Sequence, residues 1–411
     1  MKISEMFHLL KVARPPAPYG ASTLARCFSI DDVARKARIR LPLGSRNYLD
    51  TGGEGEYTLR RNRAAFDQLE LIPRQPRNVS DADTATTVLG QRVPLPFVLS
   101  PIGAPRMFHH EGELAVARAA RHAGIPYGIS TLGTTSVEDV AAQTTTPLWF
   151  QTYIWGDRGV IREAIARAKA AGFSALLFSI DTQVRSKRER EKRSGLELPN
   201  PDLALSTLLE GTLHPSWAWH FLTSPTVSFP NIGPPDQRSL ARISEMFDGT
   251  VTWDDLDWIR EIWDGPIVAK GVMGPEEAVS AADHGLDGII VSNHGGRQLD
   301  HVPATIDMLP SIVDAVGDRL EILIDSGFRR GSDIATALAL GARAVLLGRA
   351  HLYGLAAAGE AGVRHCIDIL AQELRMTMQL CGARTVAELH PGMIRRRQPP
   401  VVAARPAARP R

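Results

Sequence analysis

The chain has 411 residues, of which 44% are hydrophobic, so it is long enough for one large barrel or for two ordinary domains. Its 47 lysines and arginines nearly balance 45 aspartates and glutamates. The resulting net charge of +2 argues against a nucleic-acid binder and favours a small-molecule role. The three cysteines, Cys27, Cys366 and Cys381, form no Cys-x-x-Cys pair, so the sequence suggests neither a zinc knuckle nor a disulfide framework and fits a reducing cytoplasm.

The N-terminal region shows no export pattern. Its short apolar run is broken by charge and followed by prolines, so we expect no signal peptide. The sequence has no uninterrupted apolar stretch of the roughly 20 residues that would cross a bilayer, which predicts a soluble or peripheral protein. Residues 1–95 contain a capped helical segment followed by the turn-rich DTGGEG, and we expect them to cap one end of the main domain.

From about position 97 the pattern alternates between short apolar runs and Ala-rich amphipathic stretches, several of which close on a glycine. Eight such units predict an α/β fold, a closed (β/α)8 (TIM) barrel that spans residues 96–390. The expected strands are 96–100, 126–130, 148–152, 175–180, 266–270, 288–292, 321–325 and 344–348.

Two segments depart from this alternation. An insertion over about 184–252 follows the fourth strand, and a segment of this length predicts a lid, a binding segment or local disorder. Residues 391–411 combine Pro, Ala and Arg without periodicity, which predicts a disordered tail.

Polar and ionisable residues follow almost every expected strand, at the barrel end where active sites lie in this fold. After the last two strands, Gly327, Gly331 and Gly348 allow backbone N–H groups to approach an anion, and Arg329 and Arg349 add opposing charge. This pattern predicts a phosphate site. The alternative is that the glycines make tight turns and the arginines are solvated.

His294 and Arg297 place a titratable imidazole beside a fixed cation, as a base that acts on an anionic substrate requires. Asp181 could accept a hydrogen bond from the other ring nitrogen, or it could be a helix N-cap before Thr182. Lys270 ends an apolar run and needs an anionic partner if it is buried; a negative cofactor atom is one candidate.

Several segments together resemble one family. The runs VSNHGGRQLD (291–300), LIDSGFRRGSD (323–333), ALGARAVLLGRA (339–350) and WFQTY (149–153) are similar to the FMN-dependent 2-hydroxy acid dehydrogenase/oxidase family, over about residues 28–390. The resemblance implies FMN as the cofactor and oxidation of an L-2-hydroxy acid, with L-lactate favoured. Within the family the sequence looks most like L-lactate dehydrogenases of the quinone or cytochrome type, with (S)-mandelate dehydrogenase next.

The resemblance also implies roles for individual residues. For catalysis and substrate binding it assigns His294 as the base, Asp181 as its partner, Lys270 as the cation beside the reduced flavin, Tyr48, Arg188 and Arg297 to the substrate carboxylate, Tyr153 to the hydroxyl and Leu132 to the substrate tail. For FMN it assigns Asp325, Gly327, Arg329, Gly348 and Arg349 to the phosphate, Ser130, Gln151, Ser179, Lys270 and Ser292 to the ring and ribityl chain, and Pro101 and Gly103 to the flavin edge. No metal is implied. Hydride and carbanion schemes use the same base and both stay open.

The electron acceptor depends on a finer feature. Gly103 matches the glycine typical of family dehydrogenases, where many oxidases have alanine, so a quinone or another carrier is favoured over O2. Ile102 and Gln183 stand where the family more often has threonine and a proline or small residue, so flavin contacts there are expected to differ.

Location and assembly follow from the same resemblance. Trp217, Trp219, Phe221 and Leu222 lie where membrane-associated members have an interfacial segment, although they could equally pack on the barrel or on a neighbouring subunit. We expect a cytoplasmic homotetramer with peripheral contact to the inner face of the cell membrane. An FMN-dependent isomerase, a cysteine-dependent nucleotide dehydrogenase and a non-catalytic barrel are disfavoured.

Overall fold

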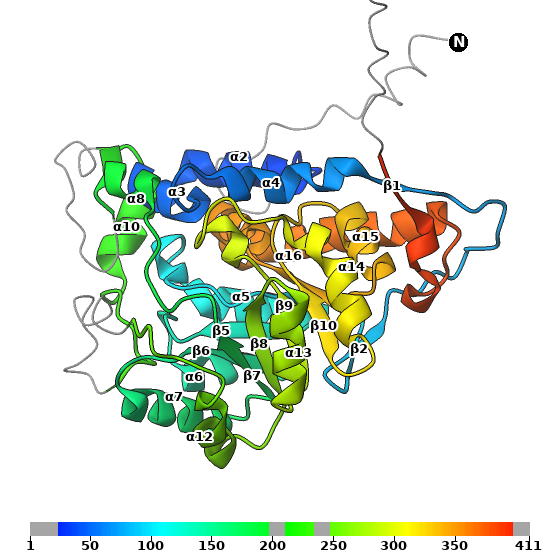
Figure 1. Cartoon of the computed structure of the whole chain (residues 1–411). Coiled ribbons are helices and arrows are strands. Elements are labelled where there is room, and N and C mark those ends of the chain that lie inside the picture. The colour runs from blue at the N-terminus through cyan, green and yellow to red at the C-terminus, as the bar shows by residue number, and fades with distance from the viewer. Residues whose placement is uncertain (1–23, 197–209, 234–246, 398–411) are drawn as a thin grey trace, which may run out of the picture.

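The computed structural model describes residues 24–196, 210–233 and 247–397. Within these ranges eight parallel strands close into a barrel in the order β10-β11-β4-β5-β6-β7-β8-β9 (Figure 1). The strands are β4 (Phe97–Leu99), β5 (Tyr127–Ser130), β6 (Leu148–Tyr153), β7 (Ala175–Ser179), β8 (Ile267–Val272), β9 (Gly288–Val291), β10 (Glu321–Ile324) and β11 (Ala344–Leu347). Each lies where the sequence predicts a strand, so the (β/α)8 prediction is confirmed.

The strands separate two apolar layers because successive side chains point to opposite faces. Val98, Trp149, Leu177, Val268 and Ile290 fill the inside of the barrel, and each is almost fully buried. The neighbouring residues on each strand face outward and pack against the helices.

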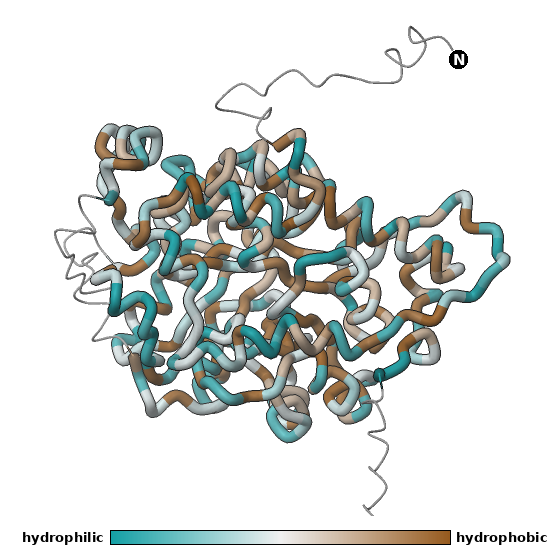
Figure 2. Tube along the Cα trace, turned by 90° about the horizontal axis from the view of Figure 1, so that it is seen from above, coloured by the Kyte–Doolittle hydropathy of each residue, from teal (hydrophilic) through white to brown (hydrophobic). Residues whose placement is uncertain are grey.

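The surrounding helices place one face on the barrel, and their hydrophobic and hydrophilic residues alternate along the coils (Figure 2). In α5, for example, Val116 and Ala120 are buried and the helix ends at Gly124, whose φ of 68° suits glycine. The barrel helices are α5 (Gly112–Ala123), α6 (Val137–Ala141), α7 (Arg158–Ala170), α12 (Asp255–Ile262), α13 (Pro275–Asp283), α14 (Thr305–Val316), α15 (Gly331–Ala339) and α16 (Arg349–Leu380).

The N-terminal segment covers both ends of the barrel. Helices α2 (Ile30–Arg40), α3 (Leu43–Asp50) and α4 (Tyr57–Ala64) form a layer across the end that carries the active site (Figure 1). The hairpin of β2 (Thr86–Val88) and β3 (Gln91–Val93) closes the opposite end, where Val88 and Val93 join the inner apolar layer.

The structure describes parts of the insertion and of the tail, and the tail differs from what the sequence predicts. The insertion contains α8 (Glu189–Ser194) and α10 (Pro215–Thr223), while 197–209 and 234–246 lie outside the described residues. The predicted disorder from 391 onward is wrong for 391–397, because Met393 is buried and β12 (Ile394–Arg396) pairs antiparallel with β1 (Leu69–Leu71). Residues 398–411 lie outside the described part of the chain. In the described ranges, no helix is both long and apolar enough to cross a membrane.

Candidate active site

The C-terminal ends of the barrel strands surround one cavity, which α3 and the loop at Arg188 cover. Sixteen of the predicted site residues line it: Tyr48, Pro101, Gly103, Leu132, Gln151, Tyr153, Ser179, Arg188, Lys270, His294, Arg297, Asp325, Gly327, Arg329, Gly348 and Arg349. The other three, Ser130, Asp181 and Ser292, lie behind the lining and bond to residues in it. The structure therefore brings all the predicted site residues together.

His294 and Asp181 form an imidazole–carboxylate pair at this cavity. The Nδ1 atom of His294 lies 3.1 Å from each carboxylate oxygen of Asp181. Burial raises the pKa of Asp181, but His294 and Lys270 lower it by more, so this carboxyl stays ionised. Asp181 follows β7 in a loop, so the alternative of a helix N-cap is wrong. With Nδ1 bonded to Asp181, Nε2 is the atom of His294 that can act on a substrate.

A glycine that the sequence reasoning missed allows this pair to form. Gly271 has a φ of 110°, and a Cβ placed there would lie 2.6 Å from the Cβ of Asp181. A side chain at position 271 would therefore push Asp181 away from His294. Its sequence signal is a glycine directly after Lys270, inside a strand, where glycine often marks the close approach of another group.

Lys270 is buried and bonded on two sides. Its Nζ donates to the Ser292 hydroxyl at 2.8 Å and lies 2.9 Å from a carboxylate oxygen of Asp325. Burial lowers the pKa of Lys270, but Asp325 and Asp181 raise it by more, so the ammonium stays charged. The anionic partner expected for Lys270 is thus supplied by the protein itself. Because Asp325 is negative and paired, a cofactor hydroxyl suits it better than the phosphate to which the resemblance assigned it.

A row of buried polar side chains crosses neighbouring strand ends. Ser130 donates to Oε1 of Gln151 at 2.8 Å, and Nε2 of Gln151 donates to Ser179 at 3.0 Å. All three side chains are almost fully buried. A row of this kind offers both donors and acceptors along one wall, which suits a flat heteroaromatic ring that carries both kinds of group.

Two arginines, Arg188 and Arg297, also line the cavity. Arg297 donates to the backbone oxygen of Tyr48 at 2.7 Å, and its guanidinium stacks over the Tyr48 ring. Burial and the neighbouring Arg297 lower the pKa of Arg188. Burial raises the pKa of Tyr153, with Asp181 adding to the effect, so its hydroxyl remains a hydrogen-bond donor. Together these groups can bind a carboxylate next to a hydroxyl.

Glu191 is a second residue that the sequence reasoning missed. It lies on α8, its side chain is 0% exposed, and its Oε1 lies 3.0 Å from Arg297. Its burial could not be inferred from the sequence, because the charged run RSKREREKR is typical of a solvent-exposed helix face. The available signal was its position three residues after Arg188, a spacing at which residues share one face of a helix.

The last two loops form the anion-binding end. Helix α16 begins after Gly348, and no side chain of the described residues caps it. Helix N-termini attract anions. Gly327 has a φ of 90°, and a Cβ there would lie 2.4 Å from the backbone oxygen of Asn62. Arg349 donates to the carbonyls of Leu49, Gly295 and Thr51, so it also fastens the N-terminal segment to the site. Burial lowers its pKa to about 10, with Arg297 adding to the effect.

Comparison with known proteins assigns this geometry to a family. A family model described as FMN-dependent dehydrogenase matches residues 37–396. The chain belongs to this family. It is 42% identical to an L-lactate dehydrogenase of Caulobacter vibrioides over 90% of this chain and 98% of the relative. An L-lactate dehydrogenase of Ectopseudomonas mendocina is 43% identical over 87% of this chain and 96% of the relative.

Solved structures agree with the family assignment. The monotopic membrane protein (S)-mandelate dehydrogenase superimposes with a TM-score of 0.87 at 36% identity and covers 90% of this chain and 100% of its own. A mandelate oxidase superimposes with a TM-score of 0.75 at 38% identity, over 88% and 96% of the two chains. The protein is therefore an FMN-dependent oxidoreductase that acts on 2-hydroxy acids.

The residues of this FMN-dependent dehydrogenase fit its cofactor. The uncapped N-terminus of α16 with Arg329 suits a phosphate, and the row from Ser130 to Ser179 suits the edge of a flavin ring. Lys270 places a fixed positive charge at the same wall. The helix N-terminus thus suits the phosphate of FMN, and the row of polar side chains suits its ring.

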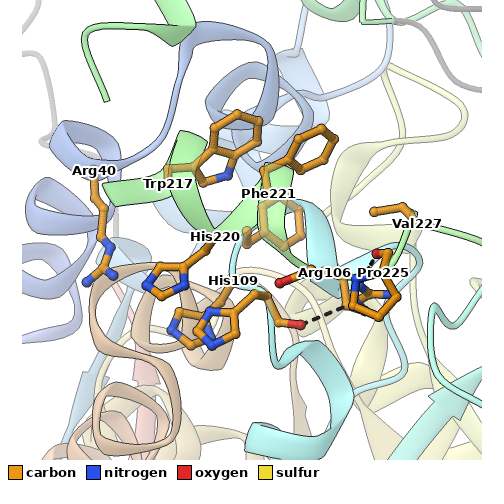
Figure 3. Close-up of a pocket in the computed structure, with 11 residues that line it drawn as sticks. Arg40, Arg106, His109, Trp217, His220, Phe221, Pro225 and Val227 are labelled. Carbon is orange, nitrogen blue, oxygen red and sulfur yellow. Dashed lines mark hydrogen bonds between the residues drawn. The ribbon is translucent and has the colours of Figure 1, made fainter. Parts of the chain in front are cut away.

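Helix α10 covers a second, smaller pocket beside the active site of this FMN-dependent dehydrogenase (Figure 3). Trp217 donates from Nε1 to the backbone oxygen of Met107 at 2.9 Å, and His220 stacks on His110 at 4.1 Å between ring centroids. Phe108 lines both pockets. Trp217 thus packs on the barrel, whereas Trp219 and Leu222 are 67% and 80% exposed. Packing on the barrel is thus confirmed for Trp217, and membrane contact of the exposed side chains stays a prediction.

Proposed function

We propose that this FMN-dependent dehydrogenase oxidises L-lactate to pyruvate and passes the electrons to a quinone or another carrier. The observation that carries the proposal is that His294, paired with Asp181, lines the same cavity as Arg188, Arg297 and the aliphatic Leu132. A small 2-hydroxy acid has the matching groups: a carboxylate, a hydroxyl and a short apolar tail. The names of the curated relatives support lactate.

In this mechanism the side chains orient the substrate and move its proton. Arg188 and Arg297 bind the carboxylate, and the Tyr153 hydroxyl donates to the substrate oxygen. His294 removes a proton at Nε2, and Asp181 stabilises the imidazolium through Nδ1. FMN, when bound, accepts the two electrons. Lys270 supplies positive charge at the wall where negative charge then accumulates.

Two other reactions compete with this proposal. (S)-Mandelate oxidation is favoured by the structural similarity to a mandelate dehydrogenase, and Leu132 can contact a ring as well as a methyl group. An O2-using oxidase is favoured by the similarity to a mandelate oxidase. Gly103 supports the dehydrogenase, since alanine is common at this position in oxidases.

The deciding experiment separates the two half-reactions. The FMN-loaded protein is mixed anaerobically with glycolate, L-lactate, L-mandelate and longer 2-hydroxy acids, and flavin bleaching is followed in time. The lactate-reduced protein is then reoxidised with a quinone analogue or with air-saturated buffer. We expect L-lactate to give the fastest bleaching and the quinone analogue the faster reoxidation. Faster bleaching by L-mandelate, or faster reoxidation by O2, contradicts the corresponding part of the proposal.

We also propose that the exposed part of α10 rests on the inner face of the cell membrane and that the protein is a cytoplasm-facing homotetramer. Trp219, Phe221 and Leu222 form an exposed apolar group on this helix. Tryptophan suits the boundary between lipid headgroups and acyl chains. The similar mandelate dehydrogenase is described as a monotopic membrane protein, which supports the membrane contact. The tetramer is supported by the family resemblance.

A further inference from the structure

Glu191 is a fully enclosed carboxylate between the two substrate arginines. Its Oε1 lies 3.0 Å from Arg297 and 3.7 Å from Arg188. Its Oε2 is buried and bonds to no group in the described part of the chain. A carboxylate that is 0% exposed is costly to ionise unless cations compensate it, and here two guanidinium groups do so.

Glu191 in turn stabilises the two arginines. Both guanidinium groups belong to the cavity wall, and the lowered pKa of Arg188 reflects burial and the repulsion from Arg297. An anion between two close cations reduces this repulsion and fixes the direction of each guanidinium. Without it, the two side chains would tend to move apart.

The same contact joins three separate segments. Glu191 lies on α8 of the insertion, Arg297 follows β9, and Arg297 also donates to the backbone oxygen of Tyr48 on α3. Helices α8 and α3 pack on each other. Glu191 therefore lies at the point where the insertion, the barrel and the N-terminal segment meet over the substrate.

We propose that Glu191 is a positioning residue that sets the charge of the substrate site and makes it select monocarboxylates over dicarboxylates. Arg188 and Arg297 contribute two positive charges and Glu191 removes one, which leaves +1 for the carboxylate of a 2-hydroxy acid. A dianion of similar size brings a second negative charge that the site does not match.

The test compares anion binding at equilibrium. FMN-loaded wild-type protein and its Glu191→Gln variant are titrated with oxalate, a dianion, and with pyruvate, a monoanion of similar size, and the flavin absorbance reports binding. We expect the affinity ratio of oxalate to pyruvate to rise by roughly tenfold or more in Glu191→Gln, because the two ligands differ by one charge and the variant removes one opposing charge. A general loss of structure would lower the affinity for both ligands and leave the ratio of the two affinities unchanged.

Two controls locate the effect. Glu191→Asp keeps the charge and shortens the side chain, so both affinities fall while the ratio stays near that of the wild type. Glu189→Gln makes the same chemical change on the same helix, at a carboxylate that pairs with Lys187 and Arg193 at the surface, and leaves the ratio unchanged.

An unchanged ratio in Glu191→Gln overturns the proposal. If that variant fails to retain FMN, the double variant Arg188→Gln/Glu191→Gln, which restores a net charge of +1, is measured in its place. A ratio shifted toward oxalate in the double variant also overturns the proposal. The inference rests on the carboxylate site of the proposed function but not on lactate or the acceptor, because both ligands bind the oxidised protein without turnover. Failure of lactate to reduce FMN therefore leaves this test intact.

Discussion

The backbone of His294 has an unusual conformation. Its φ is 56°, in a region that side chains other than glycine rarely adopt, and such strain costs about 1–3 kcal/mol. The Ser292 hydroxyl accepts a hydrogen bond from its backbone N–H, and Gly295 and Gly296 follow directly with positive φ values. The turn thus directs the imidazole back toward Asp181. The strained residue is thus the histidine that lines the cavity.

Replacing His294 by alanine should leave FMN bound and slow flavin reduction by L-lactate roughly 10^3-fold, because the general base and its positioning are lost together. Stopped-flow measurement under anaerobic conditions gives the rate, and flavin absorbance gives the cofactor content. Normal reduction kinetics in a variant that retains FMN would remove His294 from the mechanism.

Gly103 can accept a methyl group with little rearrangement. A Cβ at this position would lie 3.3 Å from the Cβ of Leu132 and 3.6 Å from the Tyr48 hydroxyl. We expect Gly103→Ala to fold, to retain FMN and to shift the ratio of reoxidation rates toward O2, because the space at the flavin edge changes. Stopped-flow reoxidation with O2 and with a quinone analogue measures this ratio. The same ratio in both proteins would show that Gly103 does not determine the acceptor.

At the scale of elements, the strands were predictable and the insertion was not. Each barrel strand is a continuous apolar run buried on both faces, which is a strong signal in the sequence. Helix α8 gives no such signal, since its charged residues look solvated and Glu191 becomes buried through contacts with Arg297 far away in the chain. Strand β12 was hidden by the Pro- and Arg-rich composition around it, because its pairing with β1 is a long-range contact.

Helix α10 provides a test of the membrane proposal. The double variant Trp219→Ser/Leu222→Ser removes two exposed apolar side chains and should lower binding to vesicles that contain anionic lipids by roughly tenfold or more. Vesicle flotation of the FMN-loaded protein measures the bound fraction.

The matched control is Met376→Ser/Leu380→Ser, which removes two exposed apolar residues from α16 and should leave vesicle binding unchanged. Equal loss in both double variants would indicate a nonspecific effect of surface hydrophobicity. No loss in the α10 variant would contradict membrane contact through this helix.

At the scale of the whole molecule, the resistance of the fold to acid depends on a buried histidine. His351 lies in the first turn of α16 and bonds to the backbone oxygen of Leu347 at 2.6 Å. Burial lowers its pKa from 6.5 to about 4. The unfolded chain therefore binds a proton at this residue before the folded chain does, so stability is lost as the pH falls below about 6.5.

Between pH 7 and pH 5 this residue should lower the free energy of unfolding by about 2 kcal/mol. In His351→Gln, the difference in the free energy of unfolding between the two pH values should be smaller by that amount. Urea unfolding at pH 7 and pH 5 measures this difference. His284→Gln is the control for the exchange of an imidazole for an amide, because His284 makes the same kind of bond to the backbone oxygen of Ser280 but is exposed. The same change in the free energy of unfolding between pH 7 and pH 5 in His351→Gln and in the wild type would contradict the prediction.

The barrel and the strand-end residues could thus be predicted because both follow from local sequence patterns. The long-range contacts that complete the site could not be predicted. Gly271 acts through Asp181, and Arg349 acts partly through carbonyls of the N-terminal segment, so each depends on a residue distant in the chain. A pattern within one segment can mark such a residue, but it does not identify the distant partner.

The bond from Arg349 to the carbonyl of Leu49 spans 300 residues. A ribosome adds about 5–20 residues per second, so helix α3 would leave the ribosome roughly 15–60 seconds before its partner exists. The carbonyl of Leu49 therefore lacks its bond to Arg349 until the start of α16 has been translated. FMN can consequently enter a complete cavity only after the segment that contributes Gly348, Arg349 and Leu352 to its lining has been synthesised.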